Sequence, residues 1–580
     1  MESVNIVVVG VNSKYIHSCL AAWYLKESLA DLDGIEVDVR EYTINNQLQV
    51  CLEDIYIRRP HVVAFSCYIW NIDFIRRLAK DLKKILPETY IVAGGPEVSY
   101  EECYDDRVFD FIIKKEGEIA FKRFVQNFVK AKNKGEDFDL SIQENCVNVD
   151  LSEVKSPYTR QMLENIENRI LYYESSRGCP FNCSYCLSSA QKGLTFLPLE
   201  TVYKDLLMFA RFGIRLIKFV DRTFNCNKER AMAIWRFITV NRNEFENIVF
   251  HFEVAGDLFD RELISLLNDM PRGQIQLEVG IQSANEKTHR EIGRVTDLEK
   301  VYKNVSAIVG KNNIHLHLDL IAGLPGEDFY SIKHSFNTIY ALRPHMFQLG
   351  FLKLLKGTAL RKRARECGVI FRDYAPYEVL RTRELSFDDI ACLKGIEDVL
   401  DRFYNSSRFH KTFEYIIGFF ESAFDFYFSF YTFLNEKSFW KRPIKADECY
   451  NYLYEFLEMN TKLNSIKNIN LNLVKECLKF DYLASNNTAN FPKCIKDQYD
   501  KNFKNIVFKR LQDNDFVEKF LPIHKGLSAK EIYKRVHIDR FSYQFFSLNC
   551  SSWYECEMNV LFDYSKKDGV TGLYRYVKVL

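Results

Sequence analysis

Residues 176–186 read Ser-Arg-Gly-Cys-Pro-Phe-Asn-Cys-Ser-Tyr-Cys and bring three cysteines, Cys179, Cys183 and Cys186, into one short stretch. The glycine, proline and asparagine favour a tight, non-helical loop, so the three thiolates can converge on one small object. Iron–sulfur clusters are held by thiolates of this kind. Three protein ligands leave one iron of a four-iron cubane able to bind a small molecule. The stretch therefore predicts a 4Fe-4S cluster with one open iron.

Two other uses of these cysteines have to be weighed. A structural zinc site needs four closed ligands, which usually come as two separated pairs. The next cysteine, Cys226, stands alone, and no second Cys/His pair follows at a suitable spacing. A disulfide with one spare cysteine is favoured still less, because the 16 cysteines of the chain follow no secretory leader. The ligand count therefore favours the iron–sulfur cluster.

Several segments after the cysteine loop alternate between polar and apolar residues. In residues 274–282 (QIQLEVGIQ), even positions are polar or glycine and odd positions are apolar. Because side chains alternate across a strand, each such strand has one apolar face and one polar face. Residues 250–254 and 314–320 repeat the pattern, and the polar-face residues are His251, Glu253, Gln274, Gln276, Glu278, Gln282, His315, His317 and Asp319.

Helical spacing between these strands favours a parallel barrel over an antiparallel sheet with one wet face, which is the alternative. The expected helices are 198–212, 228–240, 259–269, 297–309 and 329–342. A closed barrel normally fills its interior with Val, Ile and Leu. A polar interior therefore predicts that a polar ligand is bound inside.

The first part of the chain alternates short apolar strands with helices, which is typical of a parallel, doubly wound sheet. The expected strands are 5–9, 35–39, 61–67, 90–93 and 109–113. Such sheets bind ligands beyond the carboxyl ends of their strands. Ser66, Gly94-Gly95 and Gly117 all fall at those ends.

The α/β fold class is thus expected to comprise an N-terminal flavodoxin-like domain, a partial barrel and a mostly α-helical C-terminal domain. The expected boundaries are 1–134, a linker at 135–168, 169–370 and 371–580. The aromatic stretch 413–434 carries three acidic residues, so a buried helical pair is favoured over a membrane span. A net charge of +1 gives no support for nucleic acid or a membrane surface as partner. Without a signal peptide, a cytoplasmic location is expected.

The spacing Cys-x3-Cys-x2-Cys, with Tyr185 just before the last cysteine, resembles the radical S-adenosylmethionine (SAM) superfamily. The resemblance implies a partial barrel of six βα units with the cluster loop after the first strand. Six strands can be counted, near 170–175, 215–221, 249–254, 274–282, 314–321 and 346–352.

The same resemblance implies a set of SAM-binding residues. The segment after the second strand, with Asp221 and Arg222, departs from the common Gly-Gly-Glu form and looks like the variant of cobalamin-dependent members. A further set is similar to the oxygen-independent coproporphyrinogen oxidase branch. With Tyr185, the residues implied for SAM are Asp221, Arg222, Glu253, Gln282, Arg294 and Asp319.

The first domain resembles the cobalamin-binding class of the superfamily, through Gly94-Gly95-Pro96-Glu97 and Glu116-Gly117-Glu118. The implied cobalamin-binding residues are Ser66, Gly94, Gly95, Gly117 and Glu118. The alternative is a flavodoxin-like or response-regulator fold that binds a nucleotide or nothing. Residues 175–188 and 219–225 also resemble a subgroup with a C-terminal domain of unknown function, which would cover 375–580.

The Asp-x-His-x-x-Gly motif, which supplies a lower cobalt ligand in other cobalamin proteins, is missing. The corresponding loop runs from Asn12 to His17. Either cobalt lacks a protein imidazole or His17 substitutes for the missing ligand. The first is expected, because the apolar spacing of 17–30 predicts that His17 lies inside a helix.

The resemblance implies that the reduced cluster cleaves SAM to a 5′-deoxyadenosyl radical, which removes hydrogen from an unactivated carbon. With cobalamin, methyl transfer to a small-molecule or unknown substrate is the leading outcome. Radical cyclisation or rearrangement is the second reading, and a non-catalytic cobalamin or redox sensor is the third. An anaerobic reaction and an electron donor such as flavodoxin or ferredoxin are also implied. No catalytic side chain is identified.

Overall fold

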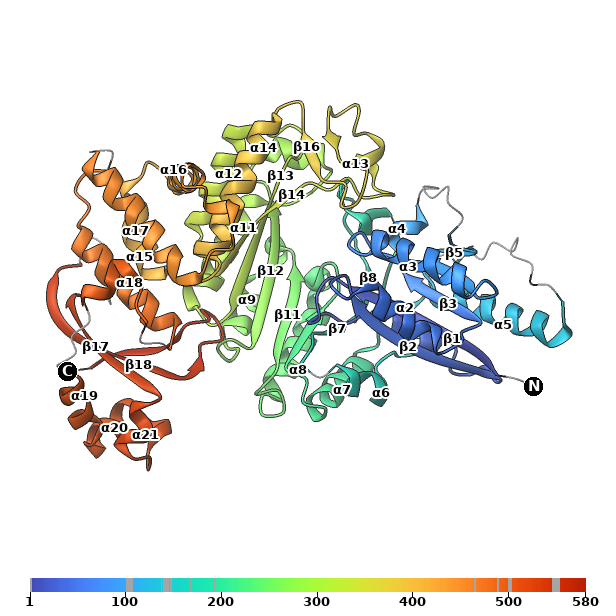
Figure 1. The fold of residues 1–580 in the computed structure, drawn as a ribbon, viewed down its shortest axis with the longest axis horizontal. Helices are drawn as coiled ribbons and strands as arrows, with labels where there is room; N and C mark the ends of the chain where they lie inside the picture. The colour runs from blue at the N-terminus through green and yellow to red at the C-terminus, as the bar shows by residue number, and fades with distance from the viewer. Residues whose placement is uncertain are drawn as a thin grey trace. The chain divides into compact units, whose positions relative to one another are not determined.

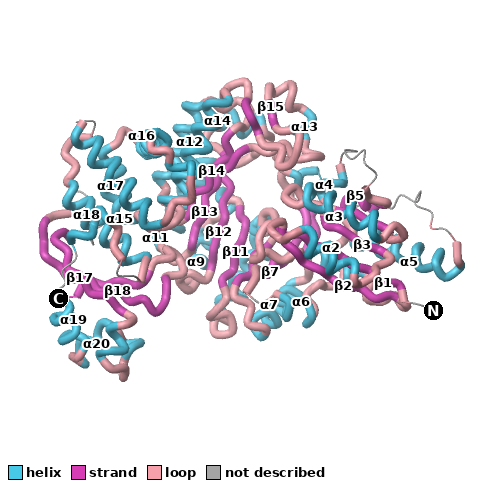
Figure 2. The backbone as a smooth tube through the Cα atoms, in the orientation of Figure 1, coloured by secondary structure: helices cyan, strands magenta, loops and turns pink. Residues whose placement is uncertain are grey.

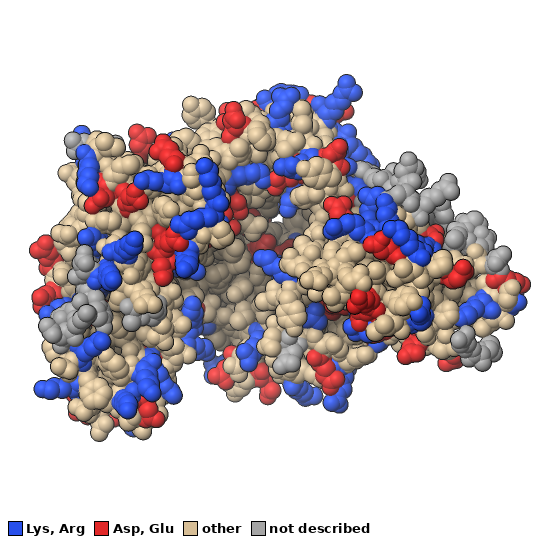
Figure 3. All heavy atoms as spheres, in the orientation of Figure 1, with Lys and Arg blue, Asp and Glu red and all other residues tan. Residues whose placement is uncertain are grey.

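The computed structural model describes residues 3–579 except 101–107, 137, 139–144, 147–148, 167, 191–192, 464–465, 488–489, 499–502 and 545–552. Its chain divides into two compact units, which we describe separately. The first comprises residues 1–308, 321–328 and 351–387, and the second 309–320, 329–350 and 388–580. On the face drawn in Figure 3, acidic and basic side chains are interspersed, as the balanced net charge leads one to expect.

The N-terminal sheet has the strand order β2-β1-β3-β4-β5-β6, and its paired strands are parallel. The strands are β1 (Val4–Asn12), β2 (Ile35–Thr43), β3 (Val62–Ser66), β4 (Tyr90–Gly94), β5 (Phe111–Lys115) and β6 (Asn145–Cys146). Their helices are α1 (Leu20–Ser28), α2 (Leu48–Tyr56), α3 (Ile72–Ile85), α4 (Pro96–Ser99) and α5 (Glu118–Lys134) (Figure 1). The order 2-1-3-4-5 is that of a flavodoxin-like fold, so this prediction is confirmed.

Alternate residues of β1 build the two sides of this sheet. Val7 and Val9 pack with the buried residues of α2 and α3, whereas Ile6 and Val8 pack with those of α1 and α5. Two separate cores arise because successive side chains of a strand point to opposite faces. The sheet is therefore covered by helices on both faces, and ligands can reach it only at its strand ends.

The second sheet has the order β14-β13-β12-β11-β10-β7 (Figure 2, magenta). Its strands are β7 (Leu171–Tyr173), β10 (Leu216–Phe219), β11 (Val249–Val254), β12 (Ile275–Gln282), β13 (His315–Ala322) and β14 (Met346–Phe351). Between them lie α7 (Leu199–Arg211), α8 (Lys228–Val240), α9 (Arg261–Asn268), α10 (Glu286–Glu291), α11 (Leu298–Lys311) and α12 (Phe329–Ala341). Buried and half-buried residues alternate along β12 and β13. The six-stranded partial barrel with one polar face is thus confirmed.

Short elements complete the first unit. They are α6 (Arg160–Asn165), β8 (Ser176–Gly178), β9 (Leu194–Phe196), α13 (Ala359–Lys362), β15 (Ile370–Phe371) and β16 (Val379–Arg381). The strands β8 and β9 form an antiparallel pair on either side of the cysteine loop.

The C-terminal part of the second unit is mostly helical, as expected. Its helices are α14 (Phe387–Val399), α15 (His410–Ile416), α16 (Ala423–Glu436), α17 (Ala446–Lys462), α18 (Leu471–Ser485), α19 (Phe503–Leu511), α20 (Asn514–Phe520) and α21 (Ala529–Tyr533). The aromatic stretch 413–434 falls in α15 and α16. None of the helices in the described ranges is long and apolar enough to cross a membrane.

Sequence reasoning missed a three-stranded antiparallel sheet in this region. It consists of β17 (Val536–Tyr543), β18 (Glu555–Lys567) and β19 (Tyr574–Val579). Phe541 and Phe562 from this sheet join the core around Phe480 of α18. The strands carry several charged residues, so their pairing depends on this non-local core more than on a local pattern.

Candidate functional site

The cysteine loop is fixed at its base and in its middle by backbone contacts. Gly178 has φ of 102°, and a Cβ there would lie 2.0 Å from the carbonyl oxygen of Gly193, so only glycine fits. Ser184 donates its N–H to Ile292 O at 2.8 Å and accepts one from Leu360 N at 2.8 Å. These bonds hold the loop against the segment after β12 and against α13.

The three thiols lie close enough to influence one another. Cys183 is buried, whereas Cys179 and Cys186 are partly exposed, and all three are free. Burial raises the pKa of Cys183, and the nearby Cys186 and Cys179 add to this rise, while Arg294 opposes it. Within the described ranges, no three His, Cys, Asp or Glu side chains surround a point where a single metal ion could bind. An iron–sulfur cube has a different requirement, because each thiolate binds its own iron.

Arg294 lies beside Cys183, and both Arg294 and Gln282 lie against Gly280. The guanidinium of Arg294 donates to Cys183 Sγ at 3.7 Å and to the carbonyl oxygen of Gly280. A Cβ at Gly280 would lie 2.2 Å from Gln282 Nε2, so the Gln282 side chain folds back over this glycine. Arg294 Nε and Gln282 Oε1 are buried without a hydrogen-bond partner. Such orphaned atoms fit a polar ligand that completes them.

The backbone of Gln282 supports the same interpretation. Its φ of 73° lies in the left-handed region, which side chains other than glycine adopt at a cost. Strain of this kind is concentrated at binding and catalytic sites. Tyr185 lies close enough to Arg294, Cys183 and Cys186 for their charges to act on it. Burial raises the pKa of Tyr185, the two cysteines add to this rise, and Arg294 opposes it.

Two further predicted residues lie along the polar faces. Glu253 on β11 is half-buried, with Lys218 Nζ 3.8 Å from its carboxylate. Burial raises the pKa of Glu253, and the charge of Glu278 acts in the same direction. Asp319 lies half-buried on β13, in the second unit, and its binding role stays a prediction.

The carboxylate of Asp221 is hydrogen-bonded to residues just before the cysteine loop. Its carboxylate accepts hydrogen bonds from Ser175 N at 2.8 Å, Ser175 Oγ at 2.6 Å and Ser176 Oγ at 2.7 Å. Burial raises its pKa against these bonds. In this structure Asp221 therefore holds the start of the cysteine loop.

Sequence reasoning missed Thr223. Its hydroxyl lies 3.6 Å from Cys179 Sγ and donates to Arg222 O at 2.8 Å. Only its place directly after Asp221 and Arg222 could have pointed to it. The segment after the second barrel strand thus contacts the cysteine loop through two side chains, Asp221 and Thr223.

A cavity of about 640 Å³ lies beyond the carboxyl ends of β1, β3, β4 and β5, wholly within the first unit. All five residues predicted for cobalamin line it, together with Arg222, which was predicted for SAM. They are Ser66, Gly94, Gly95, Gly117 and Glu118. Residues of the barrel, Tyr172, Arg177 and Val220 among them, form another part of the wall.

Two glycines of the cavity wall have little room for a side chain. Gly95 has φ of 102°, and a Cβ there would lie 2.6 Å from Cys67 O. A Cβ at Gly117 would press on Leu25 Cδ2 at 3.2 Å. A corrin with its nucleotide tail needs this close approach to the backbone, so the residues fit that group.

Arg177 connects this cavity to the cysteine loop. Its guanidinium donates to Glu118 Oε1 at 2.8 Å and to both carboxylate oxygens of Glu174, at 3.0 and 2.8 Å. Although burial opposes it, the charges of Glu118 and Glu174 hold the pKa of Arg177 above its usual value. Arg177, which lies two residues before Cys179, is thus joined to Glu118 at the start of α5.

The structure corrects the prediction for His17. Helix α1 begins at Leu20, so His17 lies in the loop before it and lines the cavity. Ile170 donates its N–H to Ile16 O at 2.8 Å, and Ser18 Oγ donates to Ile170 O at 2.9 Å. These long-range bonds replace the helical bonds that the apolar spacing had led us to expect. The reason for discounting His17 as a ligand is therefore wrong.

Comparison with known families matches three regions of the chain. Residues 6–125 match the B12 binding domain, 173–339 the Radical SAM superfamily, and 365–562 a protein family of unknown function, DUF4080. The first two ranges contain the cavity-forming sheet and the cysteine loop, respectively.

Curated relatives are similar over about half of their length. An uncharacterized methyltransferase of Pyrococcus horikoshii is 26% identical over 279 residues, 43% of this chain and 57% of that protein. The cobalamin-dependent radical SAM methyltransferase TokK of Streptomyces tokunonensis is 23% identical over 51% of this chain and 48% of its own. The hopanoid C-3 methylase of Methylococcus capsulatus is 24% identical over 44% and 49%.

Solved structures agree with the fold. The cobalamin-dependent SAM radical enzyme OxsB matches with a TM-score of 0.57 at 15% identity, over 86% of this chain and 82% of that one. TsrM from Kitasatospora setae, solved with cobalamin and a 4Fe-4S cluster, matches with a TM-score of 0.50 at 18% identity, over 64% and 76%. The chain thus combines three regions that match known families, an N-terminal B12 binding domain, a central radical SAM domain and a C-terminal DUF4080 domain.

Proposed function

We propose that this protein is a cobalamin-dependent radical SAM methyltransferase that acts on an unactivated carbon of a small molecule. When bound, a reduced 4Fe-4S cluster supplies the electron that cleaves SAM, and cobalamin carries the methyl group. The observation that carries the proposal is the Arg177 bridge, which joins the cavity residue Glu118 to the start of the cysteine loop. Two cofactor sites in one enzyme have to adjoin in this way for a group to pass between them.

The site residues have separate roles in this proposal. Cys179, Cys183 and Cys186 hold the cluster. Arg294 pairs with the methionine carboxylate of SAM, for which a guanidinium is well suited. The further SAM-binding residues proposed are Tyr185, Arg222, Glu253, Gln282 and Asp319, whereas Asp221 holds the start of the cysteine loop. Those proposed for cobalamin are Ser66, Gly94, Gly95, Gly117 and Glu118.

The division of labour along the chain is part of the proposal. Residues 1–134 bind cobalamin, 169–370 carry the cluster and SAM, and 135–168 connect them. Residues 371–580 shape the substrate pocket or bind a partner. A flavodoxin or ferredoxin supplies the electron.

Anaerobic reconstitution tests the cluster and the reaction together. We expect about four irons per chain, and 5′-deoxyadenosine once the protein is reduced in the presence of SAM. S-adenosylhomocysteine formed alongside it indicates methyl transfer, whereas 5′-deoxyadenosine alone favours cyclisation. A protein that holds the cluster but cleaves no SAM would be a sensor instead.

Single substitutions identify the ligands. Cys183→Ala should lose the cluster, whereas Cys226→Ala should keep it. Cys226 is a matched control because it lies close enough to Cys179 to have its pKa raised by burial, by Asp221 and by that thiol. A full iron content in Cys183→Ala would contradict the assignment.

A further inference from the structure

His17 lines the cavity that we assign to cobalamin. Among the described residues that line this cavity, His17 is the only histidine. We propose that His17 Nε2 is an axial ligand of the cobalt of a corrinoid bound there, although the chain lacks the Asp-x-His-x-x-Gly motif. The inference rests on the cobalamin site of the proposed function.

The hydrogen bond of the His17 ring uses Nδ1 and leaves Nε2 available to bind a metal. His17 Nδ1 lies 2.7 Å from the hydroxyl of Tyr172, and the two rings stack at 27° with centroids 6.2 Å apart. Within the described part of the chain, Nε2 has no hydrogen-bond partner. A metal-bound histidine characteristically donates its other ring N–H to a neighbouring acceptor, which fixes the tautomer and the ring orientation. Tyr172 is placed to accept that hydrogen bond.

The side chain of His17 is half-buried and forms part of the cavity wall.

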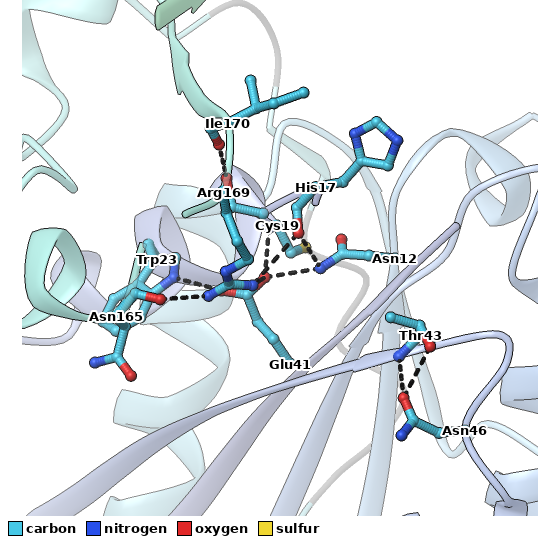
Figure 4. A network of polar contacts seen from close by, with 11 residues as sticks. Asn12, His17, Cys19, Trp23, Glu41, Thr43, Asn46, Asn165, Arg169 and Ile170 are labelled. Atoms are coloured by element: carbon cyan, nitrogen blue, oxygen red, sulfur yellow. Dashed lines mark hydrogen bonds and ion pairs between the residues drawn. The ribbon is translucent and has the colours of Figure 1, made fainter. Parts of the chain in front are cut away.

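The loop that carries His17 is held rigidly (Figure 4). Asn12 Nδ2 donates to His17 O at 3.0 Å and to Glu41 Oε2 at 2.8 Å, and Cys19 N donates to the same carboxylate at 2.7 Å. Arg169 Nη1 donates to Glu41 Oε2 at 3.1 Å. The carboxylate of Glu41 therefore ties the residues on both sides of His17 to the segment that leads into β7.

This rigidity distinguishes a ligand from a surface histidine. A half-buried histidine that only stabilises the loop would need no open nitrogen beside a cavity. A metal ligand, by contrast, has to be held in place before the metal arrives, because ordering it on binding costs affinity. Both features are present at His17.

Electron paramagnetic resonance tests the ligand directly. The full chain is produced with nitrogen-15 histidine, loaded anaerobically with natural-abundance cobalamin and reduced to the cobalt(II) state. A nitrogen-15 axial ligand splits each cobalt line in two, whereas the nitrogen-14 base of cobalamin splits it in three. We expect doublets in labelled protein and triplets in unlabelled protein.

Variants assign the signal to one residue. The doublets should disappear in His17→Ala and persist in His334→Ala, which removes an exposed histidine of α12. Tyr172→Phe should keep the doublets, because it removes only the hydrogen-bond partner of Nδ1. If His17→Ala fails to fold, the labelled wild-type protein alone still decides whether histidine binds cobalt.

Three results would overturn the inference. Triplets in the labelled protein would mean that the cobalamin base is the ligand, and the absence of nitrogen splitting would mean that cobalt has no nitrogen ligand. In both cases the absorbance of protein-bound cobalamin would leave the proposed function standing. A chain that retains no cobalamin after gel filtration would refute the cobalamin site itself, and the ligand with it.

Discussion

Lys356 and Glu97 form an ion pair in the interior of the first unit, and removing one partner has a calculable cost. Lys356 Nζ lies 2.8 Å from Glu97 Oε1, and the two side chains are only 3% and 5% exposed. Tyr377 donates its hydroxyl to the same carboxylate oxygen. The pair connects α4, which directly follows Gly94-Gly95, to the segment after the last barrel strand. Lys356→Met leaves the charge of Glu97 buried without its cationic partner, which costs about 3–5 kcal/mol.

Hydrogen exchange followed by mass spectrometry measures this cost locally. A chain with several domains does not unfold in two states, so a single unfolding free energy would be misleading. In peptides covering residues 90–100 and 351–360, Lys356→Met should speed exchange on the order of a hundred- to a few-thousand-fold. Lys362→Met, which removes an exposed lysine of α13, should leave exchange unchanged.

A second substitution separates the charge from the packing. Adding Glu97→Gln to Lys356→Met removes the buried charge but keeps an acceptor for Tyr377. Replacing both members of a buried pair is often nearly neutral, so the double variant should recover most of the lost protection. Wild-type exchange in Lys356→Met, or equally fast exchange in the double variant, would refute this reasoning.

Three further predictions concern the cluster loop and the barrel. Gly178→Ala should lower the bound iron several-fold, because the added Cβ would collide with Gly193 O. Gly310→Ala should leave the iron content unchanged, because nothing lies within 4 Å of the added Cβ, and iron and sulfide assays compare the two variants. Arg294→Lys should raise the KM for SAM about tenfold or more while the iron content stays normal, because lysine loses the forked geometry; an unchanged KM would count against the role. Although burial opposes it, a hydrogen bond from His251 and the charge of Lys218 hold the pKa of Glu278 at about 2. Because this folded-state pKa lies below the unfolded one, its stabilisation is present above about pH 4.5 and is lost as pH falls towards 2. Glu278→Gln should therefore flatten the acid limb of a pH curve for the midpoint of the thermal transition that unfolds the barrel, resolved from the other transitions by calorimetry.

Local patterns were sufficient wherever one residue type repeats at one period. The alternation in β12 and β13 predicted the barrel strands and their polar face, because a buried side of a strand has to be apolar. Gly178, Pro180 and Asn182 predicted a tight, non-helical loop around the cysteines, and the structure leaves no room for a side chain at Gly178. The sheet formed by β17, β18 and β19 was missed, since its strands are defined by a shared core with α18 rather than by their own composition.

Contacts between distant segments explain the remaining differences at the site. Asp221 was expected to bind SAM, yet its carboxylate is filled by two serines that precede the cysteines by only a few residues. No spacing rule reveals that bond, because the partners lie 45 and 46 positions away. Apolar spacing alone placed His17 in a helix, but bonds to Ile170 hold its neighbours in a loop. Both segments therefore owe their conformation to tertiary hydrogen bonds around the first barrel strand. A change to Glu41 of β2 or to Arg169 should consequently alter the loop that carries His17, because this pair ties that loop to β2 and to the segment before β7.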